Sequence, residues 1–163
     1  MSFYLIIRGP LGCGKSTISE IIAQRIKAEL ISIDKIVDKY KLDKEREQGY
    51  ISQKSFLKAN EKIIPPSLKS LKKNIPIIFD GNFYWKSQIE DLIQRLNFPR
   101  HVFTLRAPLE VCIERDLQRR SPHGADAVRA VYAKAIEFDY GTIIDATKPT
   151  EECVNDILTF LGM

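Results

Sequence analysis

Chemistry is concentrated near the start of the chain, in Gly9-Pro10-Leu11-Gly12-Cys13-Gly14-Lys15-Ser16-Thr17. This stretch has the spacing of a phosphate-binding P-loop, in which a glycine is followed by four further residues and then by Gly-Lys-Ser, here Gly9 and Gly14-Lys15-Ser16. Glycine lets the backbone curl so that successive N–H groups point inward and form a nest for phosphate oxygens. In such a loop the lysine reaches the β- and γ-phosphates and the following hydroxyl binds Mg²⁺. We therefore expect the stretch to bind ATP and Mg²⁺, with Lys15 on the phosphates and Ser16 on the metal.

The segments around this loop alternate between strand and helix patterns. Phe3 to Arg8 is typical of a buried strand, and isoleucines recur at helical spacing from Ile18 to Ile26. Further strands are predicted at 29–33, 75–80, 101–105 and 141–145, and further helices at 52–64, 67–73, 87–96, 108–120, 128–135 and 149–161. Pro65-Pro66 is expected to break or kink the chain between two of these helices. The charged stretch from 35 to 49 is predicted to be a short helix and an exposed connection.

This alternation predicts an α/β fold with a parallel sheet covered on both faces. Ligands of such sheets bind beyond the carboxyl ends of the strands. We therefore expect the loop from Gly9 to Ser16 to share one crevice with the polar residues at the strand ends, namely Asp34, Asp80, Arg106 and Asp145.

Length and composition indicate a single globular domain spanning residues 1–163. The net charge of +4 is compatible with an anionic ligand but is not the footprint of a dedicated nucleic-acid binder. The three cysteines, Cys13, Cys112 and Cys153, have no metal-ligand spacing, so we interpret them as reduced thiols. With no signal peptide and no membrane-spanning run recognised, we expect a cytoplasmic monomer or homodimer without a membrane partner.

With its P-loop, strand-ending acids and arginine-rich helix, the chain resembles the small P-loop kinases over essentially its whole length. That superfamily includes shikimate, gluconate and adenylylsulfate kinases, chloramphenicol phosphotransferase and the kinase domain of polynucleotide kinase. The resemblance implies a three-layer α/β/α fold whose five-stranded parallel sheet has the order 2-3-1-4-5. It also implies transfer of the γ-phosphoryl group of ATP, a helical lid at about 108–129 and an acceptor-binding region at about 35–64.

Within the resemblance, two acids receive roles. Asp34 matches the position of a carboxylate that faces the acceptor hydroxyl, and such a carboxylate can take the proton of the attacking group. Its alternative role is to cap a helix beginning at Lys35. Asp80 looks like the Walker B acid that holds Mg²⁺ directly or through water, with simple strand termination as the alternative. Asn82 and Phe83, which follow Asp80, are expected to face the acceptor.

Arginines after the fourth strand match the lid of these kinases. Arg115 and Arg119 share one helix face and are expected to neutralise charge on the transferred phosphoryl group. The alternative is a solvated face on which they pair with Glu110, Glu114 or Asp116. Arg129 is a further candidate for contact with the substrate.

The segment Asp145-Ala146-Thr147-Lys148-Pro149 resembles the loop that holds adenine in these kinases. Asp145 and Thr147 are therefore predicted to bind the nucleotide. An ordinary strand-to-helix connection capped by the aspartate is the alternative.

The acceptor is expected to be a small metabolite with a hydroxyl or phosphate group. Basic and aromatic residues between Asp34 and Asp80 favour a planar or anionic acceptor such as a nucleoside or nucleotide. These residues are Lys39, Lys41, Lys44, Arg46 and Lys58 with Tyr40, Tyr50 and Phe56. A kinase for nucleic-acid 5′-hydroxyl ends and a noncatalytic ATP-binding switch are the two other hypotheses. The end-kinase hypothesis is weakened because the sequence contains no basic–aromatic stripe, so a nucleic-acid partner is not favoured.

Overall fold

Five parallel strands form the central sheet of the computed structural model, which describes residues 2–163. They are β1 (Tyr4–Arg8), β2 (Glu29–Ser32), β5 (Ile77–Asp80), β6 (Arg100–Arg106) and β7 (Thr142–Asp145). Their order across the sheet is β2-β5-β1-β6-β7. Numbered among themselves along the chain, these strands have the predicted order 2-3-1-4-5.

The central strand β1 explains why both faces of the sheet are covered. All of its residues are buried, and successive side chains point to opposite faces. Tyr4 and Ile6 belong to one hydrophobic cluster, and Leu5 and Ile7 to the other. An apolar strand of this kind needs a packing layer on each side.

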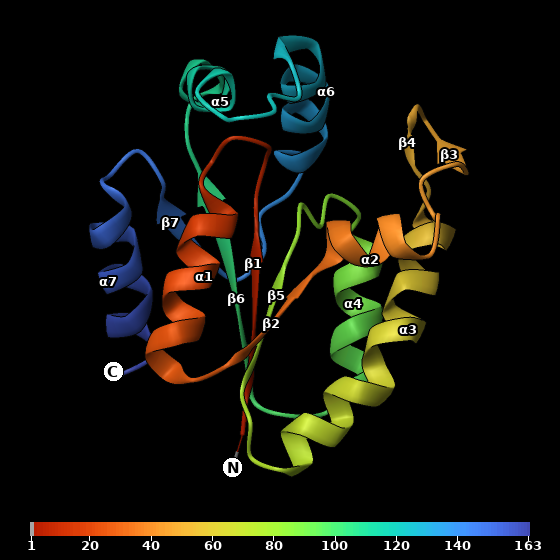
Figure 1. The fold of residues 1–163 in the computed structure, drawn as a ribbon, viewed down its shortest axis with the longest axis vertical. Helices are drawn as coiled ribbons and strands as arrows, with labels where there is room; N and C mark the ends of the chain where they lie inside the picture. Colours follow the sequence, from red (N-terminus) through yellow and green to blue (C-terminus); the bar gives the residue numbers. More distant parts are fainter. Residues whose placement is uncertain (1) are drawn as a thin grey trace.

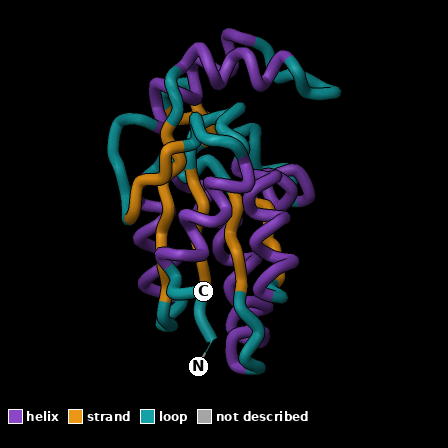
Figure 2. Tube along the Cα trace, turned by 90° about the vertical axis from the view of Figure 1, so that its left-hand side faces the viewer, coloured by secondary structure: helices purple, strands orange, loops and turns teal. Residues whose placement is uncertain are grey.

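Helices supply these layers (Figure 1). On one face lie α1 (Lys15–Ile26) and α7 (Thr150–Phe160), and on the other α3 (Gln53–Lys72) and α4 (Lys86–Arg95), with α2 (Ile33–Lys39) packed on α3. The remaining helices, α5 (Leu109–Leu117) and α6 (Ala125–Ala135), lie above the carboxyl ends of the strands, as Figure 2 also shows. The three-layer prediction is thus confirmed. None of the described helices is both long and apolar enough to cross a membrane.

Helix α3 continues through Pro65 and Pro66, so the predicted break is wrong. Each proline removes one hydrogen bond to the carbonyl four residues earlier. Both prolines are exposed, as are the residues four positions before them, so water can solvate the freed carbonyls. Ile63 and Ile64 are buried on the opposite side of the helix. Their packing holds the helix together through the proline pair.

A short hairpin was not anticipated from the sequence. Its strands, β3 (Arg46–Glu47) and β4 (Tyr50–Ile51), are joined by Gln48 and Gly49, both with positive φ. The hairpin contacts α6, because the Tyr50 hydroxyl donates a hydrogen bond to the Ala130 carbonyl at 2.7 Å. Two-residue strands without an Asn-Gly turn give too weak a pattern to be predicted.

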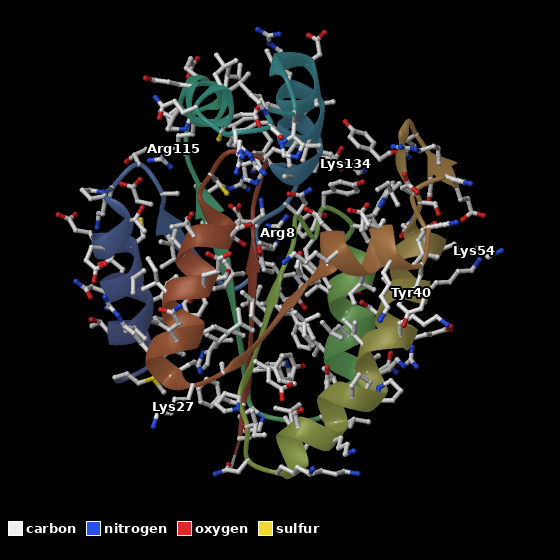
Figure 3. The ribbon with its side chains drawn as sticks, in the orientation of Figure 1. Arg8, Lys27, Tyr40, Lys54, Arg115 and Lys134 are labelled. Carbon is white, nitrogen blue, oxygen red and sulfur yellow. The ribbon has the colours of Figure 1, made fainter. Side chains whose placement is uncertain are left out.

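A second contact fastens α6 to the body of the protein. Lys134 is 5% exposed and its ammonium group lies 3.8 Å from the centre of the Trp85 ring (Figure 3). The ammonium group also donates hydrogen bonds to Glu137 and Gln48. Helix α6 is therefore docked on the hairpin and on the loop after β5.

Candidate active site

The loop from Gly9 to Thr17 connects β1 to α1 and folds tightly against α5. A Cβ atom on Gly12 would lie 2.2 Å from the carbonyl oxygen of Cys112, so only glycine allows this approach. Gly14 precedes α1 with φ of +93°, a conformation that glycine adopts without strain. The Lys15 ammonium donates to the Pro10 carbonyl at 2.7 Å, which holds the side chain across the loop. The first backbone amides of α1 have no partner within the helix and therefore provide further hydrogen-bond donors at the end of the loop.

A cleft of about 560 Å³ opens in front of this loop. Its lining includes most of the residues proposed for nucleotide chemistry: Leu11, Gly12, Cys13, Gly14, Lys15, Ser16, Thr17, Asp34, Asp80, Arg115, Arg119 and Thr147. These residues come from segments far apart in the chain. The expected convergence at the carboxyl ends of the strands is therefore observed for this set.

Ser16 and Asp80 form a pair suited to a divalent cation. The Ser16 hydroxyl donates to Asp80 Oδ2 at 3.2 Å. Asp80 is 6% exposed, and its Oδ1 atom has no hydrogen-bond partner among residues 2–163. Burial raises the pKa of Asp80, while the nearby Lys15 charge and the Ser16 hydrogen bond oppose this rise. A buried, unpartnered carboxylate oxygen beside a hydroxyl fits a hard cation that prefers oxygen ligands.

Asp34 lies in the first turn of α2 rather than at the end of a strand. Strand β2 ends at Ser32, whose hydroxyl accepts a hydrogen bond from the Lys35 amide at 3.4 Å and so caps the helix. Asp34 is thus not the cap. It lines the nucleotide cleft and also a second pocket of about 630 Å³. Its position fits a group that acts between two bound molecules.

Arg115 and Arg119, the two arginines predicted to belong to a lid, differ in their surroundings. Arg115 is partly buried and donates to the Ala146 carbonyl at 2.6 Å and to the Cys13 carbonyl at 3.5 Å (Figure 3). It thereby joins the P-loop to the loop after β7. Arg119 lines the same cleft but is exposed, and within residues 2–163 its guanidinium group has no ion-pair or hydrogen-bond partner. The alternative of pairing with Glu110, Glu114 or Asp116 is not observed for either residue.

Three residues that the sequence placed in the site line neither pocket, namely Phe83, Arg129 and Arg106. Phe83 is 1% exposed and packs in the core, because the chain turns inward at this residue with φ of +45°. Arg129 lies outside both pockets and pairs with Asp126 on the exposed side of α6. Arg106 is likewise outside the cleft, since it pairs with Asp139. Asn82 does line the second pocket, as expected.

Three residues proposed for nucleotide binding have structural roles next to the cleft instead. Gly9 and Pro10 are buried and do not line it, although Pro10 anchors Lys15. The Asp145 side chain accepts hydrogen bonds from the amide and the hydroxyl of Thr147, at 3.0 and 2.5 Å. Asp145 therefore shapes the loop after β7, and Thr147 is the residue of this pair that lines the cleft.

The predicted cationic wall of the acceptor region is also wrong. Of the five cations named, Arg46 alone lines the second pocket, and of the three aromatics only Tyr50 does. Three carboxylates line this pocket instead, Asp34, Asp38 and Asp43. The hydrophobic side of α2 packs against the core through Ile33 and Val37. This packing decides which of the intervening polar residues face the pocket.

His123 was given no role from the sequence, yet it lines both pockets. Asp116 is buried and accepts hydrogen bonds from the His123 ring at 2.9 Å, from the His123 amide at 3.1 Å and from the Gly124 amide at 3.0 Å. Burial alone would raise the pKa of Asp116, but these hydrogen bonds lower it below its usual value. The ionised carboxylate thus fixes the turn between α5 and α6. No spacing rule links these residues, which meet only through the turn.

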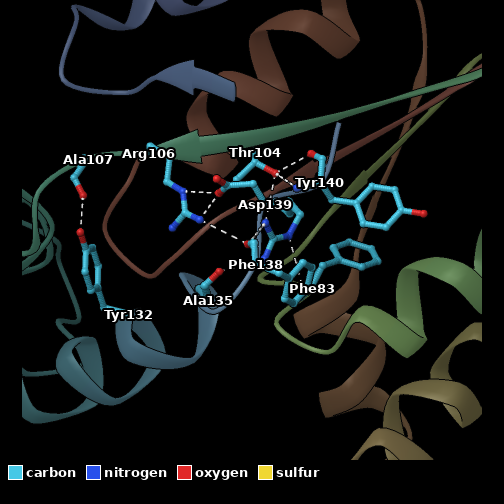
Figure 4. A network of polar contacts seen from close by, with 10 residues as sticks. Phe83, Thr104, Arg106, Ala107, Tyr132, Ala135, Phe138, Asp139 and Tyr140 are labelled. Atoms are coloured by element: carbon cyan, nitrogen blue, oxygen red, sulfur yellow. Dashed lines mark hydrogen bonds and ion pairs between the residues drawn. The ribbon is translucent and has the colours of Figure 1, made fainter. Parts of the chain in front are cut away.

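A buried arginine, Arg8, was also missed. It donates hydrogen bonds to Thr104 Oγ1 and to the carbonyls of Phe83, Ala135 and Phe138. Figure 3 labels Arg8, and Figure 4 labels these four partners. Burial lowers the pKa of Arg8 to about 10, with a further contribution from the charge of Arg106. Arg8 joins the end of β1 to the loop after β5 and to the end of α6. It thereby holds together the segments on which both pockets are built.

Comparison with known proteins gives one family and a set of similar folds. A family model described as an AAA domain matches residues 5–140. No curated protein matches the chain.

Solved structures with the same fold include three kinases. A sugar kinase from Janibacter sp. HTCC2649 has a TM-score of 0.79 and 16% identity, covering 99% of this chain and 95% of the other. A gluconokinase from Sinorhizobium meliloti 1021 has a TM-score of 0.73 and 16% identity, covering 98% and 91%. The shikimate kinase from Aquifex aeolicus vf5 has a TM-score of 0.63 and 19% identity, covering 99% and 96%. At these identities the likeness shows the fold.

Proposed function

Because the chain belongs to the AAA domain family and has the fold of the small P-loop kinases, we propose that it is an ATP-dependent kinase for a small metabolite. The observation that carries the proposal is the pair of adjoining pockets with Asp34 lining both. One pocket contains the P-loop, and the other offers space for an acceptor. A noncatalytic ATP switch would need no second pocket beside the phosphates.

In the proposed reaction the acceptor hydroxyl attacks the γ-phosphorus of ATP. Asp34 takes the hydroxyl proton as the new O–P bond forms and the bond to the leaving ADP breaks. Lys15 and the amides of the P-loop hold the phosphates in line for this attack. Mg²⁺ held by Ser16 and Asp80 would supply positive charge against the triphosphate. Arg119 is proposed to approach the transferred group when the lid closes.

The loop after β7 is proposed to hold the nucleotide base. Thr147 faces the cleft, and Arg115 fixes this loop relative to the P-loop through the Ala146 carbonyl. Base binding then depends on backbone groups whose positions are set by Asp145 and Arg115. The lid at about 108–129, the acceptor region at about 35–64 and the single domain remain predictions.

The kinase proposal is tested by calorimetry with Mg-ATP, followed by turnover assays with labelled ATP and hydroxyl compounds of varied charge. We expect a dissociation constant for Mg-ATP below the millimolar range and transfer of label to at least one acceptor. An absence of nucleotide binding at millimolar concentration would contradict the proposal. Binding with no transfer to any acceptor would favour the noncatalytic switch.

Replacement of Arg119 by alanine should reduce phosphoryl transfer by about 10- to 1000-fold, in line with the loss of one charge donor in the transition state. Arg119 is exposed and unpaired within residues 2–163, so the melting temperature should not change. The matched control is Arg120→Ala, because Arg120 is its exposed neighbour outside the cleft lining. Equal rates for the two variants would remove Arg119 from the mechanism.

A further inference from the structure

We propose that the acceptor is a cationic hydroxyl compound, such as an amino alcohol or amino sugar, whose ammonium group is bound by Asp38 and Asp43 in the second pocket. This inference rests on the proposed kinase function and specifies its substrate class. It reverses the expectation of an anionic acceptor that the lysine-rich sequence suggests. The pocket, its carboxylates and its aromatic wall carry the argument.

The charge balance of the pocket is the first step. Asp34, Asp38 and Asp43 line it, against a single permanent cation, Arg46. Asp34 and Asp38 are four residues apart on α2 and therefore project from the same side of the helix. If Asp34 serves the reacting hydroxyl, the other two carboxylates remain for recognition.

The second step is that these two carboxylates have no cation of their own. Within residues 2–163, neither Asp38 nor Asp43 forms an ion pair. The intervening lysine side chains do not line the pocket. By contrast, the carboxylate of Asp116, which lines neither pocket, is fully engaged by His123 and Gly124. Two unpaired acids that face one cavity favour a ligand that brings positive charge.

The third step concerns the tyrosines of the pocket. Tyr84 is 5% exposed and lines the cavity next to Tyr50, with ring centres 5.4 Å apart. Burial raises the pKa of Tyr84 to about 12, further above physiological pH than that of an ordinary tyrosine, and its hydroxyl is neutral. The faces of neutral aromatic rings attract ammonium groups. Tyrosine rings and carboxylates in one cavity form a suitable environment for an amine.

The size of the pocket and its charge disfavour anionic acceptors and nucleic-acid ends. A volume of about 630 Å³ is that of a small-molecule site. Carboxylate or phosphate groups of an acceptor would meet Asp38 and Asp43, and like charges brought together oppose binding. A nucleic-acid end, with its chain of phosphates, is disfavoured for the same reason. In the reaction the ammonium group is unchanged, and only the hydroxyl loses its proton, to Asp34.

The test compares each amine with its N-acetyl derivative, which lacks the positive charge and carries an added acetyl group. Wild-type protein with Mg²⁺ and labelled ATP is assayed with D-glucosamine and 2-amino-1-phenylethanol, each against its N-acetyl derivative, and with D-gluconate as the anion. Binding is measured by calorimetry in the presence of Mg²⁺ and a non-hydrolysable ATP analogue. We expect an amine to be preferred over its N-acetyl partner by about 10- to 100-fold in kcat/KM, the range for charge-assisted hydrogen bonds.

The D38N/D43N double variant should lose this preference and keep its affinity for ATP. Glu61→Gln is the matched control, because it removes one carboxylate from an exposed position of α3 outside the pocket. Preference for the N-acetyl compounds or gluconate, or no binding of any amine while ATP binds, would overturn the inference and leave nucleotide binding intact. A lack of ATP binding would instead overturn the proposed kinase function.

Discussion

Replacing Lys15 with methionine is expected to lower phosphoryl transfer about 1000-fold or more, the largest loss among single substitutions in the site. Lys15 is 9% exposed and its ammonium group is held across the P-loop by the Pro10 carbonyl. In the proposed reaction, positive charge at this point would neutralise the phosphate oxygens of ATP as the γ-phosphoryl group leaves. Methionine keeps the length of the side chain and removes the charge. Single-turnover assays with labelled ATP would measure the loss.

The control is a lysine far from the nucleotide cleft. Lys54 on α3 is exposed and points away from the body of the protein (Figure 3), so Lys54→Met should retain the wild-type rate. The Lys15 variant should still fold, since it loses one hydrogen bond, whose net contribution to stability is about 1 kcal/mol. Circular dichroism would verify this. A folded Lys15 variant with the wild-type rate would contradict the P-loop mechanism.

The second large effect is expected for Asp34→Asn, which should reduce transfer by about 100- to 10,000-fold. Asparagine keeps the shape of the side chain but cannot accept the hydroxyl proton. Asp34 is exposed in the first turn of α2, and Ser32 provides the cap, so helix formation does not depend on it. Affinities for ATP and acceptor should change little, and the loss should appear in kcat.

Asp126→Asn provides the comparison for this variant. Asp126 lies in the first turn of α6, is also exposed, and is outside both pockets. Both substitutions remove a carboxylate near the start of a helix, where it is favoured by the helix dipole by roughly 0.3–1 kcal/mol. The two substitutions should therefore have similar effects on the stability of their helices. Equal rates for the two variants would show that Asp34 is not the base.

Much of the fold follows from local sequence patterns. The run from Tyr4 to Ile7 is apolar, as expected for a strand buried on both faces, and periodic isoleucines mark α1. The P-loop could be recognised because its backbone geometry requires glycine at fixed positions, as Gly14 with its φ of +93° shows. The sheet order came from the resemblance, since spacing does not state which strands are neighbours.

Contacts between distant segments decided the rest. His123 faces both pockets because Asp116 fixes the turn before α6, and Arg8 is buried because four partners from other segments satisfy its guanidinium group. Phe83 turns into the core rather than toward an acceptor.

The second pocket shows most clearly which features follow from the sequence and which depend on the tertiary structure. The sequence from 35 to 49 determined that this region is charged, and it contains both lysines and acids. Composition does not reveal which of these side chains face the pocket. The tertiary structure places Asp34 and Asp38 there, because Ile33 and Val37 pack into the core and fix the rotation of α2 about its axis. Asp43 lines the same pocket from the segment that follows α2. A rotation fixed by burial, rather than the number of charges, therefore gives the pocket its acidic lining.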